Sequence, residues 1–553
     1  MDVHQLADVF ESFRTMALEQ DGFDPVNYIS VPGLTWDSAF RMTNSSIHLL
    51  QDSIMYECFE AGLRGGMTFV NRHHLRRNSP DDEDFDPSLP HTELLYIDAN
   101  NLYGHALSMP LPQRDFEWVE EETERHHLIQ QLPSIDVRGS IGFVAEVDLV
   151  IPDHLHDVVD DLPLAPEKMK ISREWLTPHM VQQLDGGRFL STEKLLLTHR
   201  AKHHYVIHFA LLQFYLKMGV LITKTHRVVR FVQSPFFEPY ITFNSSQRQS
   251  ATNELTKEFY KLKNNSLYGK TVENVRGRMN MRLCNTAEKL RKYTSKALFQ
   301  SCKMFGPDLV GVQLHKEEVN DILRVNHFIL SFCFSSLQIL LDKPVYIGQA
   351  VLDLSKLVMY QLRYEHLAAY SREFRGDIRI AGGDTDSFFL EIHNISLNRQ
   401  LLPKMLEDGI LDSSNYPPSY PRYSNMYKAQ LGRVKDEGAG KVWKEWLLLR
   451  PKCYSMISTN QCEHRRAKGI QRSVVTKEIS HVDYLAIFQG ATDDYRKVRR
   501  FQSSRHAIST IQQRKRALCI FEDKREWMSL NDSVAYGHHY LPKCLRFSKE
   551  DLL

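Results

Sequence analysis

The sequence predicts an α+β protein that is divided into several structural units. With 553 residues, the chain exceeds the length at which one hydrophobic core keeps growing, so about three or four units are expected. Strand-like and helix-like segments alternate as far as about residue 450. Two strand-like runs carry carboxylates at their ends, which predicts that acidic side chains gather at the edge of a sheet.

Composition places the chain among ordinary globular proteins. Hydrophobic residues make up 42% and charged residues 25%, which excludes a disordered or fibrous protein. The net charge is only +1, so any attraction to nucleic acid must come from a local positive patch. The longest apolar stretches, Tyr205 to Ile222 and Val325 to Leu341, are interrupted by polar residues, and this favours buried helices over membrane spans. No membrane segment is expected.

The cysteines and the N-terminus indicate the compartment. The eight cysteines include no Cys-x-x-Cys pair, so neither a zinc site nor a disulfide framework is predicted, and a reducing compartment fits best. Asp2, Asp8 and Glu11 interrupt the first helix-like segment, unlike a secretory signal. We expect an intracellular protein, in the nucleus or the cytoplasm of a host cell, that is not secreted.

Local patterns predict several elements in chain order. They are an amphipathic helix, a turn-rich surface loop, a strand and two helices, at Val3–Phe13, Asn78–Pro87, Ile141–Leu149, His203–Met218 and Ser250–Tyr268 respectively. Gly269 would end the last of these helices, because glycine is favoured just after a helix C-terminus. A basic and mostly helical region is expected after about residue 450.

The segment Gly382–Ser387 is the first candidate for a metal site. Asp384 and Asp386 lie two residues apart, so on a strand both side chains leave the same face. Apolar runs on both sides, with Gly382 and Gly383 as turn residues, predict a β-hairpin. Two crowded carboxylates are unfavourable unless cations neutralise them, which favours Mg²⁺, a hard ion bound by oxygen. The alternative is a solvated acidic turn.

A third carboxylate, Asp98, ends the apolar run Leu94–Ile97. It could complete a two-metal site, in which one ion activates the attacking oxygen and the other steadies the leaving one. The alternative is an aspartate that caps a helix N-terminus. Tyr103, shortly after it, could pack in the core or form a surface under an incoming sugar that excludes a 2'-hydroxyl.

A basic helix face lies between the two acidic segments. Spacings of four, four and three residues place Lys257, Lys261, Asn265 and Tyr268 on one face. Lysines there would suit a triphosphate, whose charge builds up during phosphoryl transfer, while Tyr268 and Gly269 could form a flat surface against a base pair. The alternative is a solvated basic face. Carboxylates, a lysine helix and a tyrosine in this order suggest templated nucleotidyl transfer.

Later segments suggest contacts to a nucleic-acid strand. Strand alternation places Lys452 and Tyr454 on one face, where they could touch the phosphate and sugar of a primer. The window 495–516 contains no acid, which allows a salt-sensitive grip on phosphates or simply a solvated face. Its basic residues are Arg496, Lys497, Arg499, Arg500, Arg505, Arg514, Lys515 and Arg516. We take Arg499 and Arg500, together with Lys468, as candidate DNA contacts.

With these motifs the sequence resembles the family B DNA polymerases, specifically the protein-primed branch of small bacteriophages, linear plasmids, some viruses and polinton-type elements. The likeness rests on five ordered motifs: Asp98–Tyr103 resembles motif A, Lys261–Gly269 motif B, Asp384–Ser387 motif C, Lys452–Tyr454 the Lys-x-Tyr motif, and Leu63–Gly66 the Tyr-x-Gly-Gly template loop. Leu63 departs from the tyrosine common in that loop.

The resemblance implies a right hand of palm, fingers and thumb, with an antiparallel palm sheet flanked by helices. Asp98, Asp384 and Asp386 would bind two Mg²⁺ ions, with Mn²⁺ as a substitute, and Asp98 and Asp386 would be the direct ligands. The fingers would carry Lys257, Lys261, Asn265 and Tyr268, with Tyr103 as the sugar gate. Residues implied to touch DNA are Arg64, Gly65, Gly66, Gly269, Lys452, Tyr454, Lys468, Arg499 and Arg500.

The resemblance also divides the chain into seven segments. They are 1–93, the end of an exonuclease domain and a linker with the template loop; 94–113, palm; 114–235, an insertion like the terminal-protein region; 236–275, fingers; 276–344, a second insertion with connecting helices; 345–450, palm; and 451–553, thumb. Because the earlier acidic motifs of an exonuclease have no room before Met1–Arg14, proofreading is expected to be absent.

The sequence therefore predicts a DNA-directed DNA polymerase with template-primer DNA and deoxynucleoside triphosphates as partners, used in replication of a virus or mobile element. Whether a terminal protein primes synthesis stays open. One alternative is a palm polymerase that is RNA-directed or uses ribonucleotides, against which Tyr103 argues. Another is a catalytically inactive relic that binds nucleic acid, against which the intact motif residues argue.

Overall fold

The structure is a computed structural model of the chain. It describes residues 2–184, 187, 189–277, 280–296, 299–314, 341–504 and 507–539. The chain divides into two compact units, one comprising Met1–Thr271, Pro344–Val498 and Gln513–Leu553, the other Val272–Lys343 and Arg499–Gln512. Arg505 and residues 325–340, for which a buried helix was predicted, lie outside the described residues. Mixed helices and strands in several sheets agree with the predicted α+β class.

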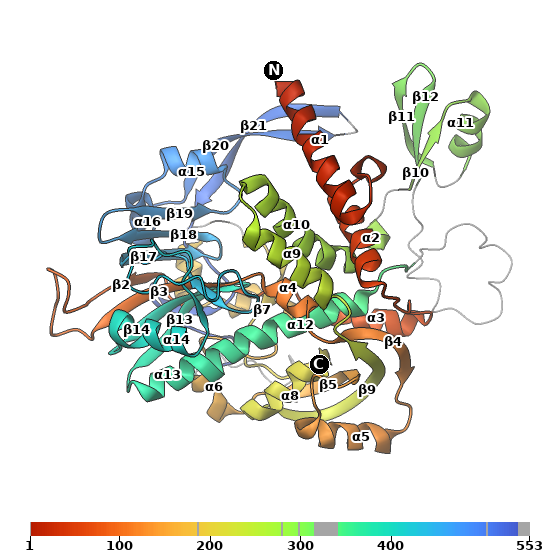
Figure 1. The fold of residues 1–553 in the computed structure, drawn as a ribbon. Coiled ribbons are helices and arrows are strands. Elements are labelled where there is room, and N and C mark those ends of the chain that lie inside the picture. The colour runs from red at the N-terminus through yellow and green to blue at the C-terminus, as the bar shows by residue number, and fades with distance from the viewer. Residues whose placement is uncertain are drawn as a thin grey trace. The chain divides into compact units, whose positions relative to one another are not determined.

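The first unit contains a six-stranded sheet with the strand order β1-β13-β14-β3-β16-β15, of which β3, β13 and β14 are labelled in Figure 1. Neighbouring strands are antiparallel except for the parallel pair of β15 and β16. Almost every residue of β3 and β14 is buried, as expected for apolar runs at the centre of a sheet. The strands are β1 (Thr68–Val70), β3 (Thr92–Ala99), β13 (Asp377–Asp384), β14 (Ser387–His393), β15 (Leu411–Asp412) and β16 (Val434–Asp436).

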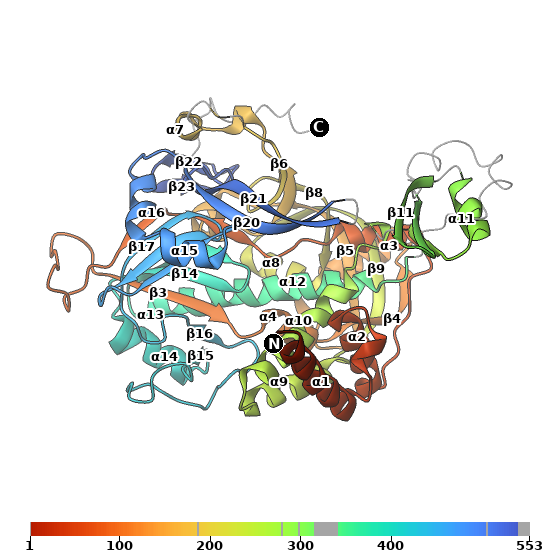
Figure 2. The same cartoon turned by 90° about the horizontal axis from the view of Figure 1, so that it is seen from above.

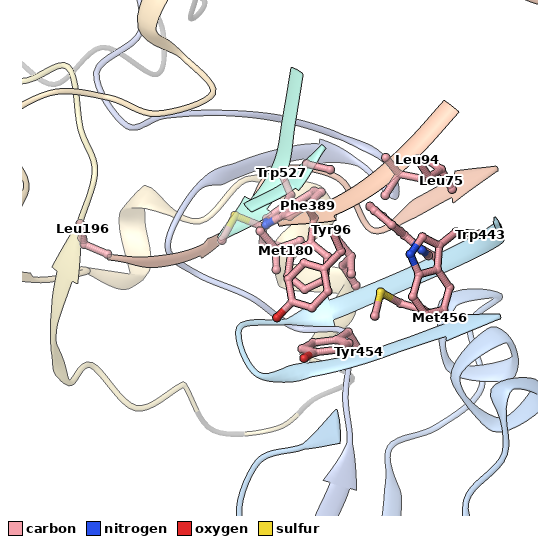
Figure 3. Close-up of a cluster of buried hydrophobic side chains, with 14 of the residues drawn as sticks. Leu75, Leu94, Tyr96, Met180, Leu196, Phe389, Trp443, Tyr454, Met456 and Trp527 are labelled. Carbon is pink, nitrogen blue, oxygen red and sulfur yellow. The ribbon is translucent and has the colours of Figure 1, made fainter. Parts of the chain in front are cut away.

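A four-stranded sheet in the order β19-β18-β17-β2 packs against the six-stranded sheet through a cluster of buried hydrophobic side chains (Figure 3). Tyr96 of β3 stacks on Phe389 of β14, with ring centroids 4.3 Å apart. Tyr454 and Met456 reach the same cluster from β18. This packing holds β3 and β14 firmly beside each other. The strands are β2 (His74–Arg76), β17 (Trp443–Arg450), β18 (Cys453–Ser458) and β19 (Glu463–Ala467).

A third sheet, in the order β4-β9-β5-β8, confirms the predicted strand at Ile141–Leu149 as β5 (Ile141–Val150). The helix predicted for His203–Met218 is wrong in its first part, where β8 (Lys202–His208) pairs with β5 and helix α8 (Phe209–Met218) begins only afterwards. Pairing with β5 and the β-branched residues Val206 and Ile207 outweigh the helical periodicity. The remaining strands of this region are β4 (Leu111–Trp118), β6 (Glu167–Lys170), β7 (Glu193–Leu196) and β9 (Leu221–Ser234).

The long helix α12 (Val345–Gln361) runs through the first unit with nearly all of its residues buried (Figures 1 and 2). The predicted N-terminal helix is confirmed as the longer α1 (Asp2–Asp21). The other helices of this unit before residue 410 are α2 (Val31–Thr43), α3 (Ser53–Ala61), α4 (Leu102–Leu107), α5 (Glu122–Gln131), α6 (Asp153–Val159), α7 (Pro178–Gln183), α9 (Glu238–Ser250), α10 (Glu254–Thr271), α13 (Ala368–Glu373) and α14 (Leu402–Glu407).

The boundaries of helix α10 differ from those predicted. It continues through Gly269 to Thr271, so the predicted stop at Gly269 is wrong. Thr271 is fully buried and its hydroxyl donates to the Tyr268 carbonyl oxygen, which favours one further helical turn. The predicted start at Ser250 instead belongs to the end of α9.

In the described residues after 450, strands outweigh helices, so the prediction of a mostly helical region is wrong there. The basic window forms a hairpin of β20 and β21, and β21 contains the β-branched residues Ile508, Thr510 and Ile511, which favour a strand. The elements are α15 (Arg472–Glu478), α16 (His481–Phe488), β20 (Asp494–Ser504), β21 (Ala507–Leu518), β22 (Glu526–Ser529) and β23 (Asp532–Val534).

Over its described residues, the second unit contains a three-stranded antiparallel sheet in the order β10-β12-β11 and the helix α11, together with the parts of β20 and β21 within Arg499–Gln512. Its elements are β10 (Asn280–Cys284), α11 (Ala287–Thr294), β11 (Phe299–Gly306) and β12 (Leu309–Leu314). Over the described ranges of both units, no helix is long and apolar enough to cross a bilayer.

Candidate active site

Three carboxylates meet at one end of the six-stranded sheet. Asp98 on β3 lies opposite Ser387 of β14, and the Ala99 backbone N–H donates to the Asp386 carbonyl oxygen at 2.7 Å. On the other side of the hairpin, Asp384 lies opposite Thr68 of β1. Antiparallel pairing thus brings residues from distant parts of the sequence to the same edge.

The hairpin of β13 and β14 forms as predicted, but its turn lies at the acidic residues. Gly382 and Gly383 belong to β13 and pair with β1, where a Cβ on Gly383 would lie 2.8 Å from the Phe69 ring. Thr385 adopts a φ of 65°. A Cβ on Gly66 would lie 2.4 Å from Thr385, so a glycine is required where this loop supports the turn.

The carboxylates carry more negative charge than their neighbours balance. Burial and the nearby Asp386 carboxylate raise the pKa of Asp98 to about 7, although Lys435 lies 3.4 Å from it. Burial likewise raises the pKa of Asp386, with a further contribution from Asp384. Lys452 pairs with Asp384 at 3.0 Å. Oxygen donors with uncompensated charge fit a hard divalent cation such as Mg²⁺, which Asp98 and Asp386 could hold, with Asp384 beside them.

A cavity of about 730 Å³ opens beside these carboxylates. It brings together Asp98, Asp386 and all five of the predicted nucleotide-binding residues. The residues that line it are Asp98, Ala99, Asn100, Asn101, Leu102, Tyr103, Arg248, Gln249, Lys257, Lys261, Asn265, Tyr268, Asp386, Asp412, Ser414, Lys428, Ala429, Lys435 and Glu437. Carboxylates therefore form one side of the cavity and basic side chains another.

Helix α10 supplies the basic side. Lys257 and Lys261 are about half exposed and contact acidic residues only at 3.9 and 3.6 Å, so both remain able to bind an anion in the cavity. Tyr268 stacks on Tyr103, with ring centroids 4.6 Å apart and an interplanar angle of 14°. Burial, with Asp386 close by, raises the pKa of Tyr103 to about 12, so its hydroxyl stays protonated.

The opposite face of α10 is anchored to the N-terminal helix. The Lys263 ammonium donates to the Asp21 carboxylate at 2.6 Å, and both side chains are fully buried. Asn264 accepts a hydrogen bond from Asn244 of α9 at 2.9 Å. These buried contacts fix the rotation of α10 and thus the direction of its cavity-lining face.

Two residues expected to touch DNA, Arg64 and Tyr454, are buried. The Arg64 guanidinium donates to the Val206 carbonyl oxygen at 2.7 Å and lies 3.6 Å from the centre of the Tyr205 ring, so the side chain is buried. Tyr454 is buried in the hydrophobic cluster of Figure 3. Strand alternation could not reveal this burial, because it depends on which sheet covers the strand.

The other predicted DNA contacts lie on the surface. Lys452 occupies the turn between β17 and β18 and pairs with Asp384, and the backbone N–H of the exposed Lys468 donates to the Lys452 carbonyl oxygen at 3.0 Å. Gly65 is exposed, and Gly269 faces open space outside the cavity lining. Arg499 and Arg500 are exposed residues of the second unit.

The sequence patterns missed several residues of the cavity. Asp412 lies on the edge strand β15 and accepts a hydrogen bond from Asn100 at 2.7 Å. Lys435 reaches Asp98 because β16 pairs with β3. Arg248 and Lys428 also line the cavity. The mixed acid and lysine run Lys435–Glu437 was the only local signal, since pairing between distant strands leaves no spacing in the sequence.

No protein-family model and no curated protein matches the chain. Among solved structures, the chain is similar to phi29 DNA polymerase with primer-template DNA and incoming nucleotide substrates, at 14% identity and a TM-score of 0.49, covering 89% of this chain and 68% of that one. The orthorhombic crystal form of phi29 DNA polymerase gives 13% identity, a TM-score of 0.48 and coverages of 91% and 70%. Similarity at this level does not by itself define a function.

Proposed function

We propose that the chain is a DNA-directed DNA polymerase that adds deoxynucleotides to a primer 3'-hydroxyl. The observation that carries the proposal is the shared cavity: Asp98 at the end of β3 and Asp386 in the turn before β14 line it together with Tyr103 and the lysines of α10. Phosphoryl transfer requires carboxylates that can bind metal ions, next to basic side chains that can hold a triphosphate.

Each group of residues has a proposed task. Asp98 and Asp386 would hold divalent cations, with Asp384 assisting, and such cations would supply charge that stabilises the oxygens of the transferring phosphoryl group. Lys257 and Lys261 would hold the triphosphate. The stacked Tyr103 and Tyr268 rings would form a flat surface that excludes a 2'-hydroxyl and tests the shape of a base pair, next to Asn265.

The fold would then be divided in the manner of a right hand. The six-stranded sheet would be the palm, formed by segments 94–113 and 345–450, and α9 and α10 would belong to the fingers in segment 236–275. Segment 451–553 would be the thumb. Segments 114–235 and 276–344 would be insertions, and 1–93 a linker carrying the template loop.

Primer-template DNA would lie along the exposed basic residues near the carboxylates. Lys452, which pairs with Asp384, and its neighbour Lys468 would contact the primer backbone. Arg499 and Arg500, which belong to the second unit, would contact phosphates there. Arg64 and Tyr454 would act by packing, whereas Gly66 would support the hairpin turn. The resemblance of the motifs to the protein-primed branch suggests replication of a virus or mobile element, with a terminal protein as the primer.

A primer-extension assay tests the proposal. The purified chain, with a labelled primer on a DNA template and Mg²⁺, should add the templated deoxynucleotide, should stop when EDTA is added, and should use ribonucleotides far more poorly. Binding of the primer-template without any extension, under Mg²⁺ or Mn²⁺, would instead identify an inactive relic. Equal use of both sugars would contradict the role of Tyr103.

A further inference from the structure

A second cluster of chemically active side chains lies outside the polymerase cavity. Four histidines and two aspartates gather where α6, the segment after β7 and the segment after β23 meet; they are His156, Asp157, Asp160, His199, His538 and His539. Within it, the ligand atoms of Asp160, His199 and His538 all lie within 4.8 Å of one another. All six residues belong to the first unit, and none of them lines the cavity.

The backbone brings these segments together by close contacts. The His199 N–H donates to the Tyr536 carbonyl oxygen at 2.8 Å. Gly537 has a φ of 83°, and a Cβ there would lie 2.8 Å from Arg200 Cγ, so only glycine lets this segment pass so close to His199. These backbone contacts therefore fix the position of His538 beside His199.

His199 is a buried histidine whose ring makes no close hydrogen bond to the described residues. Its side chain is fully buried, and among the described residues neither ring nitrogen has a hydrogen-bond partner. The Asp160 Oδ1 atom lies 3.5 Å from His199 Nε2, which is long for a hydrogen bond. Zinc bonds of about 2.0–2.2 Å in a tetrahedron place neighbouring ligand atoms about 3.3–3.5 Å apart. The observed separation matches two ligands of one metal ion.

Neighbouring residues hold Asp160 and His199 in position. The Asp160 carboxylate accepts hydrogen bonds from Arg525 at 2.6 Å and from the Ala535 N–H at 2.9 Å. The His156 ring stacks on His199 at 4.3 Å, and its two nitrogens are occupied by the Ile151 carbonyl oxygen and the His539 N–H. His156 therefore positions His199 and is not itself a ligand, an arrangement typical of the residues behind metal ligands.

We propose that Asp160, His199 and His538 bind one divalent transition-metal ion of the Zn²⁺ class. Two imidazoles favour such an ion over Mg²⁺, so this site and the carboxylate site would select different metals. Asp157 is exposed, and its carboxylate lies 3.4 Å from His538 Nε2. The ion would join α6 and the segment at His199 to the segment that follows β23, and so would stabilise the fold. The scattered cysteines gave no sign of such a site.

Metal binding to the full chain tests the proposal. After EDTA treatment and dialysis, the wild type should bind one Co²⁺ with the visible absorption of tetrahedral cobalt, and Zn²⁺ should displace it and raise the Tm. His199→Asn and His538→Asn should weaken Co²⁺ binding by more than about 100-fold. His204→Asn is the matched control, because His204 also stacks on a histidine, His226, and hydrogen-bonds to Glu146.

Two results would overturn the site: the same cobalt spectrum in His199→Asn and His538→Asn as in the wild type, or no tetrahedral spectrum in the wild type. Should either asparagine variant fail to fold, anomalous scattering from wild-type crystals grown with Zn²⁺ decides. A peak between Asp160, His199 and His538 supports the site, and its absence there refutes it.

Discussion

The two ends of the six-stranded sheet hold buried carboxylates in opposite ways. At one end, Glu391 of β14 pairs with Arg72 at 3.3 Å, and on the neighbouring strand Glu93 pairs with Arg77 at 2.8 Å. Burial alone would raise the pKa of Glu391, but His393 and Arg72 together lower it. At the other end, burial and Asp386 raise the pKa of Asp98 despite Lys435.

The difference distinguishes carboxylates whose charge is balanced by arginine from the carboxylates for which we propose a cation. Arginine partners balance the charge at the first end, whereas Lys435 is shared between Asp98 and Glu437, at 3.4 and 2.8 Å. Unbalanced buried charge is unfavourable for folding and persists where it serves a function. We call the end of the sheet with Glu93 and Glu391 the structural end, and the end with Asp98 and Asp386 the chemical end.

The largest expected difference between the two ends is in activity. Asp98→Asn or Asp386→Asn should lower primer extension by about 10³-fold or more, because these changes remove groups needed in the transition state. Primer-template affinity should change little. Glu391→Gln should leave extension within a few-fold of wild type and lower the Tm. Comparable extension by Asp386→Asn and Glu391→Gln would abolish the distinction.

The buried carboxylate of Asp21 allows the effect of charge pairing on folding stability to be measured. It is paired with Lys263, so Asp21→Ala should leave a buried ammonium uncompensated and lower the free energy of unfolding by about 3–5 kcal/mol. Asp24→Ala, which breaks a partly exposed pair with Arg14, should cost much less. Thermal unfolding of both variants measures the difference, and equal Tm shifts would contradict the role of burial.

The lysines that face the chemical end should show a smaller kinetic effect. Lys261→Ala should lower kcat/KM for the incoming nucleotide by about 10- to 100-fold, because one cationic contact to the triphosphate is lost. Lys270→Ala is the matched control, since Lys270 lies on the same helix but outside the cavity lining. Single-nucleotide incorporation measures both; equal losses would argue against a triphosphate contact of Lys261.

The smallest expected effect is the pH dependence of stability in EDTA. Because the pKa of Asp98 is raised to about 7, the folded state holds a proton that the unfolded state has lost, so stability falls as pH rises from about 4 to 7. Asp98→Asn should remove this fall and gain on the order of 1–3 kcal/mol over wild type at pH 8, but little at pH 4.

Glu391→Gln should behave in the opposite way, because the lowered pKa of Glu391 contributes stability at neutral pH that is lost on acidification. Its Tm should fall below that of wild type at pH 8 and approach it in acid. Thermal unfolding across this range measures both profiles. Parallel profiles for Asp98→Asn and wild type would show that Asp98 is not the group responsible.

Much of the site was predictable because its chemistry lies in local patterns. The two-residue spacing of Asp384 and Asp386 and the helical spacing of Lys257, Lys261 and Asn265 each define a face before the fold is known. Neither pattern predicts which helices and strands lie side by side. The pairing of β3 with both β14 and β16, which adds Lys435, arises from packing over the whole unit.

Local sequence patterns do not reveal burial or pairing that depends on distant elements. Arg64 and Tyr454 carry polar groups in motif-like positions, yet a neighbouring ring or sheet covers each of them. The strand β8 was predicted as helix because its pairing with β5 is not visible locally. The cluster around His199 is not predictable from the sequence for the same reason, since its members come from three separate segments with no regular spacing.

Mn²⁺ binding followed by electron paramagnetic resonance tests the central claim most directly, because bound and free Mn²⁺ differ in signal. The His199→Asn background removes the competing histidine site. In that background, the chain with deoxynucleoside triphosphate should bind Mn²⁺, and adding Asp98→Asn and Asp386→Asn should abolish the nucleotide-dependent binding. Unchanged Mn²⁺ binding after both substitutions would contradict a metal site formed by these two carboxylates.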